Sequence, residues 1–287
     1  MKTFSLIGTV ETWFYEETIL PIVHRMSNLE KLFFSLIIDN KQFLDGNRLH
    51  NDIVNHLLKL NQFTFNIVSR IYDYQPIDIR SNEDIQRTFE IFSNEQIISC
   101  VDYFPEKKFG QCHYYSYPYR LRIYENITHN FPGGLFPCVR EISLFDEHPY
   151  EHEFFLRLSQ AFPFLRKLKI QNFKAQNEKS SDCQHLQVIE YFSLTELYLI
   201  EVHDDYIEQF LIDSKAFFPN DLSVSVRFQS LERVTNHFTR DQMKLNAAKI
   251  KHFFLVNCEH ELSEDFKEYF PNLKTHSFSL LSLLCRE

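Results

Sequence analysis

The chain has 287 residues, 44% of them hydrophobic, which is enough for a packed core and excludes large-scale disorder. A net charge of -9 and a pI near 5.8 disfavour nucleic acid as a partner, because DNA and RNA are bound by clustered Lys and Arg. Thirty Phe beside five Gly disfavours nucleotide enzymes, and no P-loop, GxGxxG or GxSxG motif can be written with those glycines.

No apolar run approaches the roughly 20 residues of a membrane-spanning helix, and the short run at 4–10 is followed at once by Glu11. The six cysteines are scattered without a CxxC pair, which is typical of free thiols in a reducing compartment. We therefore expect a soluble cytoplasmic protein without membrane contact, with the nucleus as the alternative.

A Phe-Pro dipeptide recurs along the chain. Six of the ten prolines directly follow phenylalanine, at Phe104-Pro105, Phe131-Pro132, Phe136-Pro137, Phe162-Pro163, Phe218-Pro219 and Phe270-Pro271. Successive spacings of 27 (104 to 131), 31 (131 to 162), 56 (162 to 218) and 52 (218 to 270) fit a unit of about 27 residues or twice that length.

The same period appears in the apolar pattern, which reads apolar-x-x-L-x-x-L-x-L. It begins at Met26, Leu57, Phe136, Phe162 and Tyr191, and less cleanly at Phe270. Each unit changes from helical to alternating period, so a short strand and a helix are expected in each. One unit cannot bury enough apolar surface alone, whereas stacked units can.

These patterns predict an α/β fold: a leucine-rich-repeat-like solenoid with short parallel strands on the concave face and helices on the convex face. We expect a single domain over 1–287, with degenerate repeats at about 71–135. An ordinary α/β sandwich is the alternative, in which the period would be accidental.

In chain order, helical apolar spacing is expected at Ile97, Val101 and Phe104, and longer helices are expected at 148–162 and 205–218. Three capping patterns mark helix starts: Asp205 with Glu208, Thr239 with Gln242, and Ser263 before two acidic residues. Proline is expected to end each helix.

The frames at 136–145, 162–170 and 193–202 resemble the irregular repeats of the F-box and leucine-rich-repeat protein family. This resemblance implies repeats that select a protein, joined to an F-box that docks on the adaptor of a cullin-RING ubiquitin ligase. The nearest counterpart of the F-box, at 14–26, lacks the usual Leu-Pro opening and runs directly into the first repeat.

Side chains alternate across a strand, so the positions between the buried ones form a readable surface. Aromatic anchors surrounded by charge are typical of protein interfaces. The predicted protein-binding residues are Phe33, Phe145, Lys167, Lys169, Glu196, Tyr198, Ile200, His252 and Phe254.

The leading hypothesis is a non-catalytic module that binds a protein on this surface without a cofactor. The alternatives are the substrate-recognition part of an F-box ubiquitin ligase, with its F-box upstream, and, more remotely, an uncharacterised hydrolase.

Three other clusters have a structural interpretation. His148, Glu151 and His152 could share a metal, but the pattern favours a solvated helix start. The acidic stretch 201–208 lacks the spacing and glycine of a calcium loop, which favours helix capping. Aromatic residues and arginines alternate at 113–122 and could stack on RNA bases, although such a strand in an acidic protein favours a structural role.

Overall fold

The computed structural model describes residues 2–40, 42–72, 80–92, 95–177, 187–258 and 262–274. The chain divides into two compact units, Met1–Tyr119 and Arg120–Glu287. The division falls inside the stretch 71–135, where the sequence predicts degenerate repeats within one domain. Each unit is described by itself.

The N-terminal unit is built on a five-stranded mixed sheet. Its strands are β1 (Thr3–Thr12), β2 (Lys31–Asp39), β3 (Gln62–Tyr72), β4 (Gln96–Phe104) and β5 (Phe109–Tyr117), in the order β1-β2-β3-β5-β4. The first three strands are parallel, and β5 pairs antiparallel with both β3 and β4.

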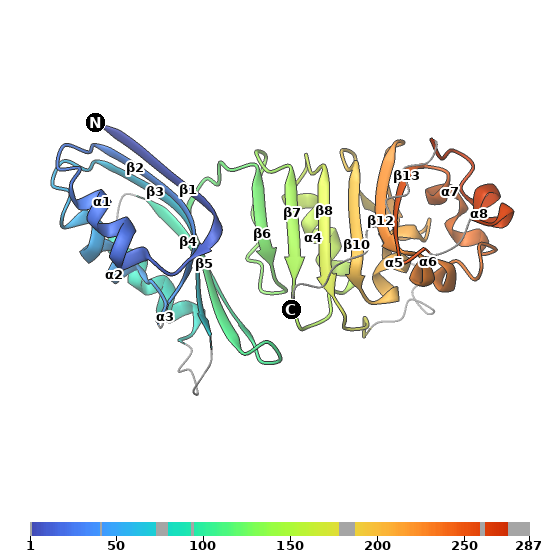
Figure 1. Ribbon diagram of the computed structural model, residues 1–287, viewed down its shortest axis with the longest axis horizontal. Coiled ribbons are helices and arrows are strands. Elements are labelled where there is room, and N and C mark those ends of the chain that lie inside the picture. The colour runs from blue at the N-terminus through green and yellow to red at the C-terminus, as the bar shows by residue number, and fades with distance from the viewer. Residues whose placement is uncertain are drawn as a thin grey trace. The chain divides into compact units, whose positions relative to one another are not determined.

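Short helical segments connect these strands (Figure 1). They are α1 (Leu20–His24), α2 (Gly46–Leu49) and α3 (Asn82–Thr88), with π-helical turns at Tyr15–Ile19 and His50–Val54 and a 3₁₀ turn at Phe89–Ile91. The Asp45 and Ser81 side chains cap α2 and α3 by accepting a hydrogen bond from a backbone N–H. Apolar residues alternate along β2, and Phe34 packs edge-on against Phe63 in the core.

The helix expected from Ile97, Val101 and Phe104 is wrong, because these residues lie in strand β4. A tight turn at 105–108 returns the chain as β5, so Pro105 ends a strand and not a helix. Buried residues occupy both faces of β4, and such a strand shows apolar spacings of three and four that imitate a helix.

The C-terminal unit contains a six-stranded sheet whose strands are all parallel. They are β6 (Ile123–Ile127), β7 (Glu141–Phe145), β8 (Lys167–Asn172), β10 (Glu196–Val202), β12 (Leu222–Arg227) and β13 (Ile250–Val256), lying side by side in chain order (Figure 1). Two short strands, β9 (Ile189–Glu190) and β11 (Ala216–Phe217), form a separate parallel pair. The predicted α/β class with parallel strands is confirmed.

Helices occupy most of the connections between these strands. They are α4 (His152–Ala161), α5 (Asp204–Leu211), α6 (Phe228–Val234) and α7 (Lys244–Ala247), with a 3₁₀ turn at Asp241–Met243, and a further helix, α8 (Glu264–Tyr269), follows β13. Connections between parallel strands are right-handed, so a sheet that grows in one direction carries its helices on one face. The buried face of the sheet meets them; Phe253 of β13, for example, packs 5.8 Å from Phe266 of α8. Every helix in the described part of the chain is too short or too polar to cross a bilayer.

The phenylalanines of the Phe-Pro pairs have a shared structural role. Phe136 and Phe162 stack with ring centres 5.0 Å apart, and Phe131 stacks on Phe162 at 5.5 Å. Further along, Phe218 stacks on Tyr191, which holds the corresponding place in its own frame. Helix α4 ends at Ala161, directly before Phe162-Pro163, and α8 ends directly before Phe270-Pro271. Four of the six phenylalanines therefore take part in aromatic stacks, and two of the six dipeptides directly follow a helix.

Several predicted helix boundaries need correction. Helix α5 ends at Leu211, well before residue 218, because Ile212 is extended and Asp213 instead accepts hydrogen bonds from the backbone N–H groups of two later residues. The predicted Asp205–Glu208 capping box is wrong, since His203 is the N-cap of α5. The turn near Thr239 has no side-chain cap. The Ser263 cap is confirmed by a 3.2 Å bond from the N–H of Phe266.

Candidate functional site

Eight of the nine predicted protein-binding residues lie on one sheet of the C-terminal unit. They are Phe145 in β7, Lys167 and Lys169 in β8, Glu196, Tyr198 and Ile200 in β10, and His252 and Phe254 in β13, and we call them the outward sheet face. Six of them alternate with buried residues of their strands, which places them opposite the core. The other two, Ile200 and His252, lie beside irregularities in the strand pairing. Phe33 lies in β2, within the N-terminal unit, where it is half-buried.

The strand register aligns these residues in rows. Glu196 pairs with Lys167 on one side and with Ser223 on the other, and Ser223 pairs with His252. The next row runs from Lys169 through Tyr198 and Ser225 to Phe254. Six of the eight residues therefore lie in two adjacent rows, although they are up to 87 positions apart in sequence (167 to 254).

Lys167 is at the centre of a charged and aromatic group. Its ammonium nitrogen lies 3.7 Å from a carboxylate oxygen of Glu196, 4.0 Å from one of Glu141, and 4.9 Å from the centre of the Tyr198 ring. The Tyr198 hydroxyl donates to Glu196 at 3.0 Å. Partial burial and that hydrogen bond raise the pKa of Tyr198. For Lys167, burial acts to lower the pKa, but Tyr198 and the two glutamates outweigh it and the pKa is raised.

The part of the face near β12 combines large and small side chains. Ser225 is almost fully buried, although its side chain lies on the outward side in register with Tyr198 and Phe254. Phe254 keeps 37% of its surface exposed. Two aromatic residues with a serine between them offer apolar area at low conformational cost, which suits a protein interface.

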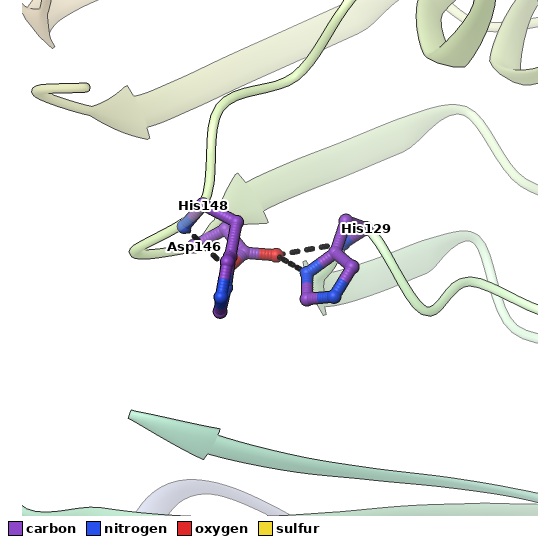
Figure 2. Close-up of side chains that lie close together, drawn as sticks. All are labelled: His129, Asp146 and His148. Atoms are coloured by element: carbon purple, nitrogen blue, oxygen red, sulfur yellow. Dashed lines mark hydrogen bonds and ion pairs between the residues drawn. The ribbon is translucent and has the colours of Figure 1, made fainter. Parts of the chain in front are cut away.

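A second cluster lies where β6 and β7 end, and Figure 2 shows its three side chains, His129, Asp146 and His148. One carboxylate oxygen of Asp146 lies 2.7 Å from Nδ1 of His129, and the other lies 3.2 Å from Nδ1 of His148. The imidazole rings are 4.5 Å apart between centres. One ligand atom from each residue lies within 4.8 Å of the other two.

Asp146 is the buried centre of this cluster, and the two imidazoles are open to solvent. Its side chain is 2% exposed, whereas those of His129 and His148 are 40% and 58% exposed. The backbone N–H groups of both histidines also donate to its carboxylate, at 2.7 and 2.9 Å. Burial acts to raise the pKa of Asp146, but these hydrogen bonds outweigh it and hold the pKa below its usual value.

The metal grouping of His148, Glu151 and His152, which the sequence disfavours, does not form. His152 is buried, with Nε2 2.9 Å from the carbonyl oxygen of Gln187, so its interpretation as solvated is wrong. Glu151 accepts hydrogen bonds from the backbone and side chain of Asn177. His148 joins Asp146 instead.

The acidic stretch 201–208 serves helix α5 and its neighbours. Besides the His203 cap, Asp204 pairs with Arg233 at 2.9 Å and Glu208 pairs with Arg240 at 2.7 Å. Asp205 accepts a hydrogen bond from the backbone of Gln176 at 2.9 Å. The structural interpretation of this stretch is confirmed, although its capping residue is His203.

Sequence reasoning missed His129 and Asp146. Asp146 follows a clean alternating strand, which was a usable signal, because strand ends of a parallel sheet gather polar residues at one edge. His129 gave no such signal: β6 lies in the stretch without a clean repeat frame, so its parallel pairing with β7 was not expected.

The sequence matches no protein-family model, and searches of curated proteins and of solved structures find no match.

Proposed function

We propose that the C-terminal unit is a protein-binding module and that the outward sheet face is its binding surface. The observation that carries this proposal is the register that places Tyr198 and Phe254 on either side of the small Ser225, beside the paired charges of Lys167 and Glu196. Aromatic anchors next to charge that is already compensated match the centre of known protein interfaces.

The same sheet supports a leucine-rich-repeat-like solenoid, with this face as the concave one. Parallel strands in chain order are what stacked repeats produce. A repeated detail adds support: Asp146 and Asn172 each lie seven residues after the frame residues Val139 and Leu165 (146 - 139 and 172 - 165). Each accepts a 2.9 Å hydrogen bond from the backbone N–H two residues later. In the consensus of leucine-rich repeats an Asn follows one position later, eight residues after the corresponding leucine.

The partner we propose is a protein that supplies apolar side chains to the Tyr198 and Phe254 region. Because Lys167 already has two carboxylates nearby, its charge contributes little further attraction to an incoming group. Burial of the aromatic rings is the larger expected contribution, at roughly 25 cal/mol per Å² of apolar surface.

Site-specific photo-crosslinking in the native lysate tests the surface. A benzophenone amino acid placed at Tyr198 or at Phe254 should capture the same protein, whereas the same group at Leu245 should not capture it. Leu245 is a matched control because it lies in α7 of the same unit and is 69% exposed. Equal capture at all three positions, or capture at Leu245 alone, would contradict the proposal.

Once the partner is identified, the Tyr198→Ala/Phe254→Ala double variant should weaken binding by at least about 30-fold, the effect of one interface hot spot of 2 kcal/mol. Leu245→Ala should leave the affinity unchanged. Recovery of a ubiquitin-ligase adaptor together with the captured protein would favour the substrate-receptor alternative over a free-standing module.

A further inference from the structure

The His129–Asp146–His148 cluster contains more polar side chains than are needed to hold the loops in place. Asn172 occupies the position of Asp146 in the following repeat, and its side chain holds its loop through the backbone groups of Lys174 and His148. Backbone contacts of this kind are sufficient to hold a loop, and Asp146 makes two of them. The two imidazoles that also converge on Asp146 are therefore not explained by loop capping.

The donor set is that of a transition-metal site. Two imidazole nitrogens and a carboxylate oxygen are common zinc ligands, and three protein ligands leave one position of a tetrahedral site for water. Bonds of about 2.0–2.1 Å place tetrahedral ligand atoms about 3.3 Å apart. The Nδ1 atoms of His129 and His148 lie 2.7 and 3.2 Å from different oxygens of Asp146. One ligand atom from each residue lies within 4.8 Å of the other two, so small side-chain shifts would bring all three around one ion.

The burial of the cluster also fits an ion. The carboxylate is fixed by backbone donors from both loops, which orients it before any ligand binds. The imidazoles are open to solvent, so an ion can enter and the fourth position can hold water. Asp146 can accept but not donate in its ionised form, so each Nδ1 carries a hydrogen in the hydrogen-bonded state. On metal binding that hydrogen moves through solvent to Nε2, which leaves each imidazole neutral with its Nδ1 lone pair on the metal.

We propose that His129, Asp146 and His148 form a binding site for one divalent transition-metal ion, with zinc as the best match. The site joins the loop after β6 to the loop after β7. His129 and Asp146, one from each loop, are 17 residues apart in sequence. It is independent of the protein-binding proposal, because none of its residues belongs to the outward sheet face.

Calorimetric titration of Zn²⁺ into the metal-stripped full chain, kept reduced, tests the site. One ion should bind per chain, and His129→Gln, His148→Gln and Asp146→Asn should each weaken binding by at least about tenfold, since even residues behind the ligands have effects of 10–100-fold. Asp146→Asn can keep only one of the two backbone hydrogen bonds, because different carboxylate oxygens accept them, so circular dichroism should check its fold. The two histidine variants leave both of these bonds in place. His237→Gln removes an exposed imidazole that lies 3.4 Å from the Glu232 carboxylate; it is the matched control and should leave binding unchanged.

Cobalt provides a second, spectroscopic readout. Co²⁺ should give the visible bands of a tetrahedral nitrogen and oxygen site without a thiolate charge-transfer band, and the bands should disappear in His148→Gln. A thiolate band would assign the ion to cysteines such as the exposed Cys138 and overturn the proposal. Absence of Zn²⁺ binding to a folded chain, or binding that all three variants retain, would show that the cluster is a hydrogen-bonded loop contact only.

Discussion

The hydroxyl of Tyr206, in helix α5, accepts a 3.0 Å hydrogen bond from the backbone N–H of Tyr150, 56 residues earlier in the chain. Tyr150 in turn donates its own hydroxyl to the carbonyl of Ile127, at the end of β6, at 2.7 Å. Both tyrosines are fully buried. Two side-chain hydroxyls therefore connect three successive parts of the C-terminal unit.

Removal of the Tyr206 hydroxyl, although only one oxygen atom, should lower the free energy of unfolding substantially. Tyr206→Phe leaves the buried N–H of Tyr150 without its partner, and such a group costs about 1–3 kcal/mol. Tyr198→Phe is the control, because it removes a hydroxyl from the outward sheet face and should change stability by less than about 0.5 kcal/mol. Urea unfolding of both variants measures the difference, and equal stabilities would show that water or a shifted backbone replaces the lost bond.

The aromatic stack predicts a contrast between two phenylalanines that are two residues apart. Phe162 is buried against Phe131 and Phe136, so Phe162→Ala should destabilise the unit by about 3–5 kcal/mol. Phe164 is half exposed and lies under the Arg140 guanidinium at 5.1 Å, so Phe164→Ala should cost no more than about 1 kcal/mol. Thermal unfolding followed by circular dichroism compares them. Similar losses would mean that the stack is not a main source of stability.

The buried strand positions of the C-terminal sheet could be predicted from the sequence. The apolar frames placed Leu168, Ile170, Leu197 and Leu199 in buried strand positions, and all four are buried in parallel strands. Such positions can be predicted because one face of the strand meets the core and the other meets solvent, so apolar and polar residues alternate along it.

Prediction from apolar spacing failed where both faces of a strand are buried. In β5, the residues from Phe109 to Tyr115 are all buried, and no alternation remains to reveal the hairpin with β4. Side-chain clusters between repeats were equally hidden, since the contact between His129 and Asp146 depends on the pairing of β6 with β7. A pattern within one segment carries no information on which segment lies beside it.

Lys167 and Tyr198 should contribute little to each other's effect on stability. Substitutions at these residues should therefore alter binding without unfolding the protein. Their contact at 4.9 Å is partly exposed, so a double-mutant cycle with Lys167→Met and Tyr198→Leu should give a coupling energy of about 0.5–1 kcal/mol. Chemical unfolding of the two single variants and the double variant measures it. A coupling above 2 kcal/mol would mean that the face is part of the folded scaffold, and that loss of binding in Tyr198→Ala could reflect a local change of fold.

The N-terminal unit offers a prediction about acid stability. His113, in β5, is buried with Nε2 2.7 Å from the side-chain oxygen of Asn66, and burial lowers its pKa from 6.5 to about 3. Below pH 6.5 the unfolded chain binds a proton at this residue, whereas the folded chain does not until about pH 3. The stability contributed by the neutral ring is therefore lost as the pH falls through this window, by up to about 1.4 kcal/mol per pH unit.

The variant His113→Gln isolates this effect, because glutamine keeps a donor for Asn66 and cannot titrate. The native chain should lose stability faster than the variant between pH 6 and pH 4, and the two curves should run parallel at higher pH, since every other titrating group is shared. Urea unfolding at intervals across this range provides both curves. A constant difference between them from pH 7 to pH 4 would mean that the folded protein protonates His113 as readily as the unfolded chain does.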